Sequence, residues 1–325
     1  MANFRANADK FADLNEYGFS DVAGNYLEWK VKQGSTPDGK VIGFPIDIGP
    51  TGMFYREDVF AQGGLPTDPA QVGTALGTWD SFFEAATQLK GKTGGLMVVN
   101  ASAVFNLVVG QGTTRFIDPS NTFIGDQQHI RTAWDLAVKA VTLGVDAKTE
   151  DGSTDWNAGI TKAASRSSSA RPGPHRHPQQ RAGHVRQVAR RERAGGPGNI
   201  GGSFLAVTKS AKNPQLAYDI VKWILSPENA AQGFADASLF PASPASYQME
   251  ALTKGDEFFG GQKTIDIFGP AAEKIPIAFE APADAAVSAP FFNELVNVEQ
   301  GKNAEEGWKA AVEAAKQIGQ RAGVN

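Results

Sequence analysis

The sequence predicts an α/β protein, because apolar strands and amphipathic helices follow one another along the chain. The clearest example begins at residues 201–207, where a glycine pair leads into a short apolar strand. Asn213 and Pro214 then supply the N-cap and the first residue of a helix. Apolar residues recur at helical spacing in this helix, which predicts that one face is buried; they are Leu216, Ala217, Ile220, Val221 and Ile224.

A second helix followed by a strand is predicted between residues 78 and 99. Thr78 is the expected N-cap, and the apolar positions after it follow the 3.6-residue period. These positions are Trp79, Phe82, Phe83, Ala86 and Leu89. Gly94 and Gly95 end the helix, and residues 96–99 form a short apolar run that predicts a buried strand.

The remaining elements fit the same class. Residues 1–45 are predicted to form helix and loop leading to a strand, and two further helices are expected around 101–110 and 130–143. A last helix begins at the capping pair Asn303 and Glu306. Its buried face is expected at Trp308, Ala311, Val312, Ala315 and Ile318. Four tryptophans on apolar helix faces are interpreted as packing residues: Trp79, Trp134, Trp223 and Trp308.

Length and composition exclude several classes of protein. With 325 residues the chain has room for about two domains, and 41% apolar residues suffice for packed cores. The absence of cysteine excludes disulfides, thiol nucleophiles and cysteine-based zinc sites. No run of apolar residues is long enough to span a membrane. The first residues, Met1 to Arg5, lack the apolar core of a signal peptide.

Two blocks of sequence carry a resemblance to a known family. The first is Gly-Phe-Pro-Ile-Asp-Ile-Gly-Pro at 43–50, followed by residues 53–60 and by Thr78, Trp79 and Asp80. The second is the glycine-led strand with its helix, ending at residues 222–228. In this order and separation they resemble family 1 extracellular solute-binding proteins, the sugar receptors of ABC importers. The resemblance covers nearly the whole chain outside residues 165–194.

This resemblance implies an α/β fold of the type II periplasmic-binding-protein kind, with two lobes joined by crossing hinge strands. Residues 1–46 and 206–243 are expected to form the remnant of the N-terminal lobe, and 47–205 and 244–325 the C-terminal lobe. Crossing strands are expected near 44–50 and 203–208, with a third near 241–246. The family carries a strand–helix–strand unit ahead of the point that matches Met1, so the first lobe is expected to be incomplete.

A sugar site needs aromatic faces for C–H surfaces and planar polar groups for hydroxyls, placed in a cleft. By resemblance, the expected ligand-binding residues are Asp47, Gly49, Asn106, Trp156, Gly202 and Phe240. From the residues alone, Asp47 fits a turn as well as a sugar contact, and the two glycines fit either turns or close backbone approach. Trp156 fits a core position as well as a cleft wall.

The implied function is capture of a sugar or oligosaccharide and its delivery to the membrane subunits of an ABC permease. The protein is then expected outside the cell or in the periplasm, membrane-anchored or free, and as a monomer. No enzyme, cofactor, metal or nucleic-acid partner is expected. The glycine pattern at 196–201 opens a strand instead of a helix, so a dinucleotide site is not predicted there.

Residues 165–194 differ from the rest of the chain. They contain eight arginines, one acidic residue and three of the four histidines. One interpretation is a disordered linker, because so polar a segment buries too little to fold. Another is an arginine-rich arm that binds anionic partners, although it has no aromatic residue to stack on bases. We prefer a third, translation in a shifted reading frame, since suitable codons in another frame restore Pro-Ala-Trp and Ser-Gly-Lys-Trp. The product of a decayed gene, which binds sugar weakly or not at all, is then a further possibility.

Overall fold

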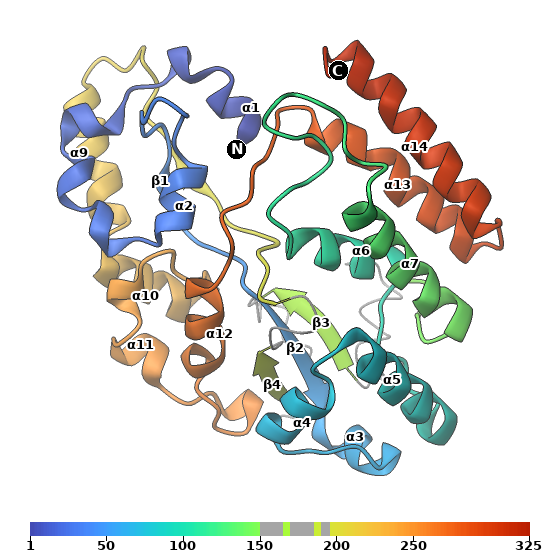
Figure 1. Ribbon diagram of the computed structural model, residues 1–325. Helices are drawn as coiled ribbons and strands as arrows, with labels where there is room; N and C mark the ends of the chain where they lie inside the picture. Colours follow the sequence, from blue (N-terminus) through green and yellow to red (C-terminus); the bar gives the residue numbers. More distant parts are fainter. Residues whose placement is uncertain (150–164, 170–184, 190–195) are drawn as a thin grey trace.

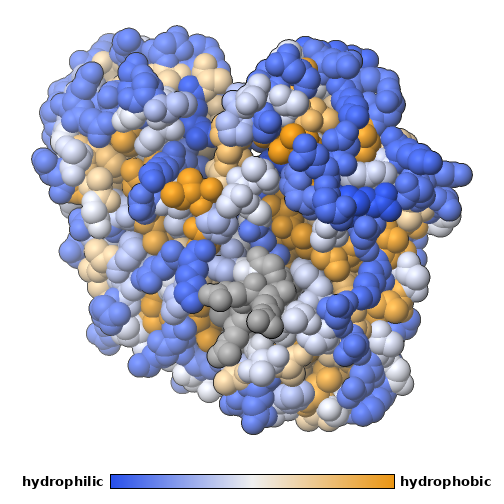
Figure 2. All heavy atoms as spheres, in the orientation of Figure 1, coloured by the Kyte–Doolittle hydropathy of each residue, from blue (hydrophilic) through white to orange (hydrophobic). Residues whose placement is uncertain are grey.

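The computed structural model describes residues 1–149, 165–169, 185–189 and 196–325. Its helices lie in two groups on either side of a central passage of extended chain (Figure 1). We call the group with α1, α2 and α9 to α12 the first body, and the group with α3 to α7, α13 and α14 the second body. The space-filling view shows the two bodies separated by a notch at the top (Figure 2).

The described helices divide between the two bodies. The helices of the first body are α1 (Ala2–Arg5), α2 (Glu28–Gln33), α9 (Pro214–Ile224), α10 (Pro227–Ala237), α11 (Glu250–Thr253) and α12 (Thr264–Glu273). Those of the second body are α3 (Glu57–Gly63), α4 (Pro69–Ala75), α5 (Trp79–Thr93), α6 (Ala101–Gly110), α7 (Gln128–Leu143), α13 (Asp284–Glu299) and α14 (Ala304–Arg321). The first body also contains short 3₁₀ turns between residues 8 and 25.

The strands form two separate antiparallel sheets. The smaller sheet pairs β1 (Phe44–Pro45) with β5 (Phe204–Leu205). The larger sheet has β2 (Thr51–Arg56) in the middle, between β3 (Ser165–Ser169) and β4 (Val185–Ala189). Its centre strand is largely buried, as expected for a strand paired on both edges.

Aromatic rings dominate the core of the second body. Phe291 on α13 has no exposed surface and lies 5.2 Å from Phe116 and 5.8 Å from Phe105, centroid to centroid. Trp308 on α14 and Trp134 on α7 complete the cluster at 5.6 and 6.5 Å from Phe291. Because these rings come from α6, α7, α13 and α14, they join the whole helical layer in one core.

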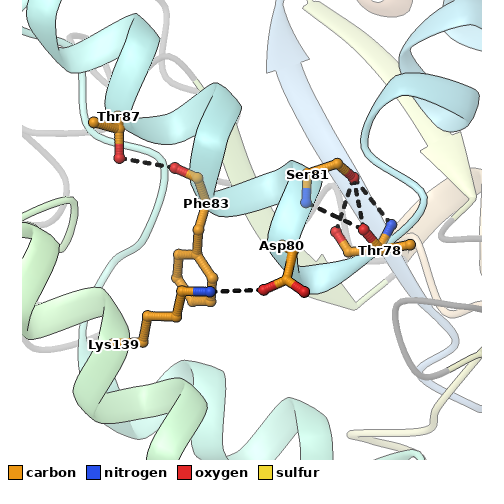
Figure 3. Close-up of polar contacts among 6 residues, drawn as sticks. All are labelled: Thr78, Asp80, Ser81, Phe83, Thr87 and Lys139. Carbon is orange, nitrogen blue, oxygen red and sulfur yellow. Dashed lines mark hydrogen bonds and ion pairs between the residues drawn. The ribbon is translucent and has the colours of Figure 1, made fainter.

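Helix α5 shows how local sequence and tertiary contacts agree. Thr78 Oγ1 accepts a hydrogen bond from the Ser81 amide, and Ser81 Oγ accepts one from the Thr78 amide, which closes a capping box (Figure 3). Lys139 of α7 reaches across to pair with Asp80 at 2.7 Å (Figure 3). Its ammonium also lies 5.2 Å from the ring centroid of Phe83. The predicted cap at Thr78 is therefore confirmed, as is the C-terminal Gly94, which adopts a left-handed conformation.

Other predicted helices also lie where the sequence places them. The helices predicted around 101–110 and 130–143 are α6 and α7. The Asn213 side chain caps α9 and accepts a hydrogen bond from the Leu216 amide. The Asn303 side chain caps α14 and accepts hydrogen bonds from the amides of Glu305 and Glu306. The tryptophans of α7 and α14 are buried as predicted, at 1% and 9% exposure.

Two expectations about local structure were wrong. Residues 96–99 form no strand, because only Val98 makes a bridge, a parallel one to Asp146. The buried face of α9 is narrower than its apolar pattern predicts. Only Tyr218 within α9 is fully buried, whereas Trp223 is 70% exposed and three neighbours are also largely exposed: Leu216, Ile220 and Ile224. Trp223 is therefore not a packing residue in this structure.

Three apolar cores bear on the predicted lobes. The largest draws on residues 53–145 and 281–324. A second joins Leu27, Trp29 and Ile48 to residues 231–275, and the third joins residues 12–44 to 207–225. The lobe boundaries given above stay a prediction. The packing of 252–275 on Leu27 and Trp29 favours placing that part of 244–325 with residues 1–46 instead of with 47–205.

The structure differs from the expectation of disorder at ten residues of the arginine-rich segment. Residues 165–169 and 185–189 are the strands β3 and β4, in register with β2 over five pairs each. Strand pairing uses main-chain groups, so a segment poor in apolar residues still pairs when a neighbouring strand offers two free edges. The rest of 165–194 lies outside the described residues. Among the helices that the structure describes, none is long and apolar enough to cross a membrane.

The aromatic cluster predicts a large stability difference within one helix. Phe291→Ala should lower the free energy of unfolding by about 3–5 kcal/mol, because it removes a fully buried ring and leaves a cavity. Val296→Ala on the same helix, at a side chain that is 43% exposed, should change it by less than about 1 kcal/mol. Urea denaturation followed by circular dichroism measures both, and equal losses would contradict the assigned packing.

Candidate functional site

The two bodies are connected by two antiparallel chain segments, residues 44–51 and 198–205, which we call the crossing. Hydrogen bonds run along its whole length: Ile46 N–H donates to the Ser203 carbonyl at 3.1 Å, and Ile200 N–H donates to the Gly49 carbonyl at 3.1 Å. At its far end Thr51 N–H donates to the Gly198 carbonyl at 2.9 Å. The predicted crossing strands near 44–50 and 203–208 therefore pair with each other.

A third segment lies against the same strand. Asp47 bridges to Pro241, and Ile48 N–H donates to the Phe240 carbonyl at 2.9 Å. A further connection between the two bodies runs from α12 to α13 (Figure 1). Its Glu280 carbonyl accepts a hydrogen bond from Arg5 at 2.9 Å, so the chain near the N-terminus is tied to a segment that leads into the second body.

Glycines permit the close approach of the two strands of the crossing. A Cβ on Gly49 would lie 2.8 Å from the Gly201 nitrogen. Gly202 has φ of +106°, and a Cβ there would overlap the carbonyl oxygen of Asp47 and lie 2.7 Å from Lys30 Nζ. The structure thus brings Gly49 and Gly202 together with Asp47, and backbone contact is the role that it gives the glycines.

Asp47 is buried at 2% exposure within the crossing. Its carboxylate accepts a hydrogen bond from the Ser203 amide at 2.8 Å, so it holds the two strands in register. Gly49 is fixed in a matching way, because its amide donates to the Asn199 side chain at 2.8 Å. The Ser203 side chain lies beside this bond and is exposed.

Lys30 is a residue of this region that the sequence does not reveal. It lies on α2, has no exposed surface, and its ammonium is 4.0 Å from the ring centroid of Phe204 in β5. Burial lowers the pKa of Lys30 to about 8, and the nearby carboxylates of Asp47 and Glu280 oppose that shift. The Lys30 ammonium therefore lies against Gly202 and Phe204 of the crossing.

The other expected site residues lie in different places. Asn106 is exposed on α6, one turn before Gly110 at the end of that helix. A Cβ added to Gly110 would lie 3.7 Å from the side chain of Ile200, which belongs to the crossing. Asn106 thus lies near the crossing on the side of the second body. Trp156 lies outside the described residues. Phe240 is 1% exposed and packs on Phe234 and Phe268 at 6.0 Å, so its ring has no free face for a sugar in this conformation.

Sequence reasoning missed Lys30 and Asn199, and no local signal would have found them. Lys30 follows Trp29 in a short polar helix, a pattern that is typical of a solvated lysine. Both residues gain their place from contacts with segments more than 100 positions away. In the described part of the chain no group of three or more metal-binding side chains lies together.

The glycine pair predicts a sharp difference between neighbouring substitutions. Gly202→Ala should destabilise the protein by about 1–3 kcal/mol, because alanine is strained at its positive φ and its Cβ overlaps Asp47. Gly201→Ala should be tolerated, since its Cβ would be 3.6 Å from the nearest atom, in Gly49. Thermal unfolding of both variants tests this, and the assignment fails if Gly201→Ala is the more damaging change.

Lys30 predicts a specific dependence of stability on pH. Below about pH 8 the lysine is protonated in both states, so the folded protein bears the full cost of burying the charge. Between about pH 8 and pH 10.5 only the unfolded chain keeps the proton, so stability rises with pH. Relative to Lys30→Met, the wild type should gain on the order of 3 kcal/mol over this range.

Chemical denaturation at a series of pH values measures this gain. Lys32→Met is the control for loss of one lysine on the same helix, because the Lys32 side chain is 53% exposed. A pH-independent difference between the wild type and Lys30→Met would show that the buried lysine does not titrate in this range.

Comparisons with known proteins agree with this architecture. Residues 4–260 match the family described as bacterial extracellular solute-binding protein. The lactose-binding protein of Rhizobium radiobacter is 27% identical over 278 residues, which are 79% of this chain and 64% of that protein. The chain thus spans less than two thirds of the length of this curated relative.

Solved structures show the same fold. The crystal structure of an extracellular solute-binding protein of family 1 is 27% identical, with a TM-score of 0.90 over 98% of this chain and 83% of that one. An ABC-transporter-associated binding protein of B. animalis subsp. lactis, in complex with β-1,6-galactobiose, has a TM-score of 0.79 at 22% identity, over 99% and 83% of the two chains. The lacto-N-biose-binding protein of Bifidobacterium longum has a TM-score of 0.79 at 18% identity, over 100% and 81%.

The predicted fold class and family resemblance are therefore confirmed. Two bodies with separate cores, joined by paired crossing strands, are the common plan of these proteins and of the structure described above. The chain belongs to the family of bacterial extracellular solute-binding proteins.

Proposed function

We propose that the chain is the substrate-binding component of an ABC transporter and captures a short galactose-containing oligosaccharide for import. The observation that carries the proposal is the crossing, which joins two separately cored bodies through a few main-chain pairs. Such a connection allows the bodies to close around a ligand, as in other two-lobed binding proteins. Delivery to the permease subunits, a location outside the cell and a monomeric state are parts of this proposal.

The choice of sugar follows from the relatives. The curated relative is a lactose-binding protein, and two proteins of the same fold were solved with β-1,6-galactobiose and lacto-N-biose. All three names refer to disaccharides that contain galactose. A galactoside is therefore the class to test first, ahead of the maltose that a more distant relative binds.

Closure around a sugar requires contacts from both bodies, since a ligand shifts the open–closed equilibrium only by its different affinity for the two states. Asn106 is our candidate on the second body, because it is the exposed residue of the largely apolar α6, beside the crossing. On the side of the first body the Ser203 hydroxyl is exposed at the edge of the crossing. Asp47 then acts mainly by fixing the strand that carries this hydroxyl.

Calorimetric titration tests the proposed ligand class. The chain as it stands should bind lactose and β-1,6-galactobiose weakly. A chimaera whose residues 165–194 are replaced by the corresponding segment of the lactose-binding relative should bind at least about tenfold more tightly, as expected for a restored aromatic contact of 1–3 kcal/mol. Maltose is the control ligand. Equal affinity for maltose and lactose, or no binding by the chimaera, would contradict the proposal.

The same titration tests Asn106. In the chimaera, Asn106→Ala should weaken lactose binding by about tenfold, the value of one lost hydrogen bond of about 1 kcal/mol or slightly more. Gln71→Ala, at an exposed position of α4 away from the crossing, is the matched control. Unchanged affinity in Asn106→Ala would remove this residue from the site and leave the ligand class untouched.

A further inference from the structure

Asp146 of the second body is a buried carboxylate without a partner. The residue is 5% exposed, and within the described part of the chain neither of its enclosed carboxylate oxygens receives a hydrogen bond. Buried polar groups of folded proteins are nearly always paired, so each exception calls for a proton, a water molecule or an ion. An unpaired charge in such a place costs several kcal/mol.

Main-chain pairing directs this carboxylate inward. Asp146 forms a parallel bridge with Val98, in which Val98 N–H donates to the Val145 carbonyl at 3.2 Å and Ala147 N–H donates to the Val98 carbonyl at 2.8 Å. Residues that face each other across such a bridge carry their side chains on the same side. Val98 belongs to the large aromatic core, so the Asp146 side chain lies on the core side of this pair.

Glu299 is a second carboxylate in the same region. It is the last residue of α13 and is half-buried, and its Oε1 accepts a hydrogen bond from the amide of Ala101, the first residue of α6, at 2.5 Å. Burial raises the pKa of Glu299, and the charge of Asp146 adds to this rise. The two carboxylates are therefore close enough to repel each other in a poorly solvated place.

The two lysines near this pair are engaged elsewhere. Lys148 Nζ donates to the main-chain carbonyl of Glu299 at 2.9 Å, and Lys90 Nζ donates to the Leu143 carbonyl at 3.2 Å. Both lysines are exposed, so water and salt screen their charges. Their fields and the Asp146 amide lower the pKa of Asp146, but burial still raises it. Neither ammonium thus replaces a direct partner of this carboxylate.

We propose that Asp146 and Glu299 bind a Ca²⁺ ion between the end of α13 and the start of α6. Asp146 offers both carboxylate oxygens, and Glu299 offers Oε2, because its Oε1 is occupied by the Ala101 amide. Ca²⁺ accepts carboxylates and waters in irregular geometry, so two side chains and solvent complete its coordination. The ion neutralises two neighbouring charges and ties residues 145–149 to α13. This inference goes beyond sugar capture and does not depend on it.

Titration of the 325-residue chain with Ca²⁺ tests the site. After removal of metal by a chelator, calorimetry should show one ion per chain with a dissociation constant of about 10⁻⁴–10⁻³ M, as expected for few protein ligands. In about 10 mM Ca²⁺ the midpoint of thermal unfolding should rise by about 2–4 °C, because the ion binds only the folded chain. Mg²⁺ at the same concentration should raise it less, since Mg²⁺ demands regular octahedral geometry.

Four variants distinguish the pair from other charges. Asp146→Asn keeps the shape of the side chain and should weaken Ca²⁺ binding by at least about tenfold. Glu299→Gln should weaken it similarly, although its side-chain oxygen can still accept the Ala101 amide. Lys148→Met removes a competing positive charge and should strengthen binding about threefold. Glu306→Gln removes an exposed carboxylate on α14 and should leave binding unchanged.

Stability without metal separates a Ca²⁺ ligand from a structural hydrogen-bond acceptor. At neutral pH and in chelator, Asp146→Asn should be at least as stable as the wild type, because it removes an unpaired buried charge. A clear loss of stability in this variant would contradict the proposal.

Three further results would overturn it. One is the absence of Ca²⁺ binding, which would leave a proton as the partner of the Asp146 carboxyl group. Another is equal stabilisation by Ca²⁺ and Mg²⁺, which would show a general effect of ionic strength. The third is equal weakening of Ca²⁺ binding in Asp146→Asn and Glu306→Gln.

Discussion

The arrangement of the whole molecule depends on the main-chain pairing between residues 44–51 and 198–205. The first of these segments leads from one apolar core to the next, because Phe44 belongs to one core, Ile48 to another, and Met53, two residues beyond the segment, to the third. The backbones approach so closely that Gly49 and Gly202 tolerate no side chain. The relative position of the two bodies is thus set by peptide hydrogen bonds together with an apolar contact, in which the Phe54 ring of β2 lies 6.0 Å from the Phe268 ring of α12.

A buried lysine in such a connection has a physical consequence. Removing an ammonium from water costs several kcal/mol, and Lys30 recovers part of this through the Phe204 ring and the field of Asp47. Any opening of the crossing that admits water would reduce that cost. The charge therefore favours small movements of the strands, whereas the hydrogen bonds of Asp47 and Asn199 to the opposite strand resist them.

The sequence predicts those features that depend on neighbours along the chain. Caps at Thr78, Asn213 and Asn303, and the helical periods that follow them, correspond to α5, α9 and α14. The fold class follows from this alternation, and close backbone approach is one of the two interpretations that the sequence leaves open for Gly49 and Gly202, the other being a turn. The sequence does not predict how much of an apolar face becomes covered, since α9 has the pattern of a buried helix and leaves Trp223 exposed. Nor does it predict that Lys30 is buried or that Phe240 lies within a core, because both depend on segments distant in sequence.

The uneven burial of the two bodies explains why the crossing also matters for stability. The core that includes α9 contains nine fully buried described residues, and it is much smaller than the aromatic core of α6, α7, α13 and α14. Small cores are marginal, because less of their surface is removed from water on folding. This core therefore relies on its attachments: Phe44 and Val207 anchor it to the strands that lead into the crossing, and within the first body Trp29 of α2 donates a hydrogen bond to the Ala272 carbonyl of α12 at 2.9 Å, which joins the neighbouring core to the same helix.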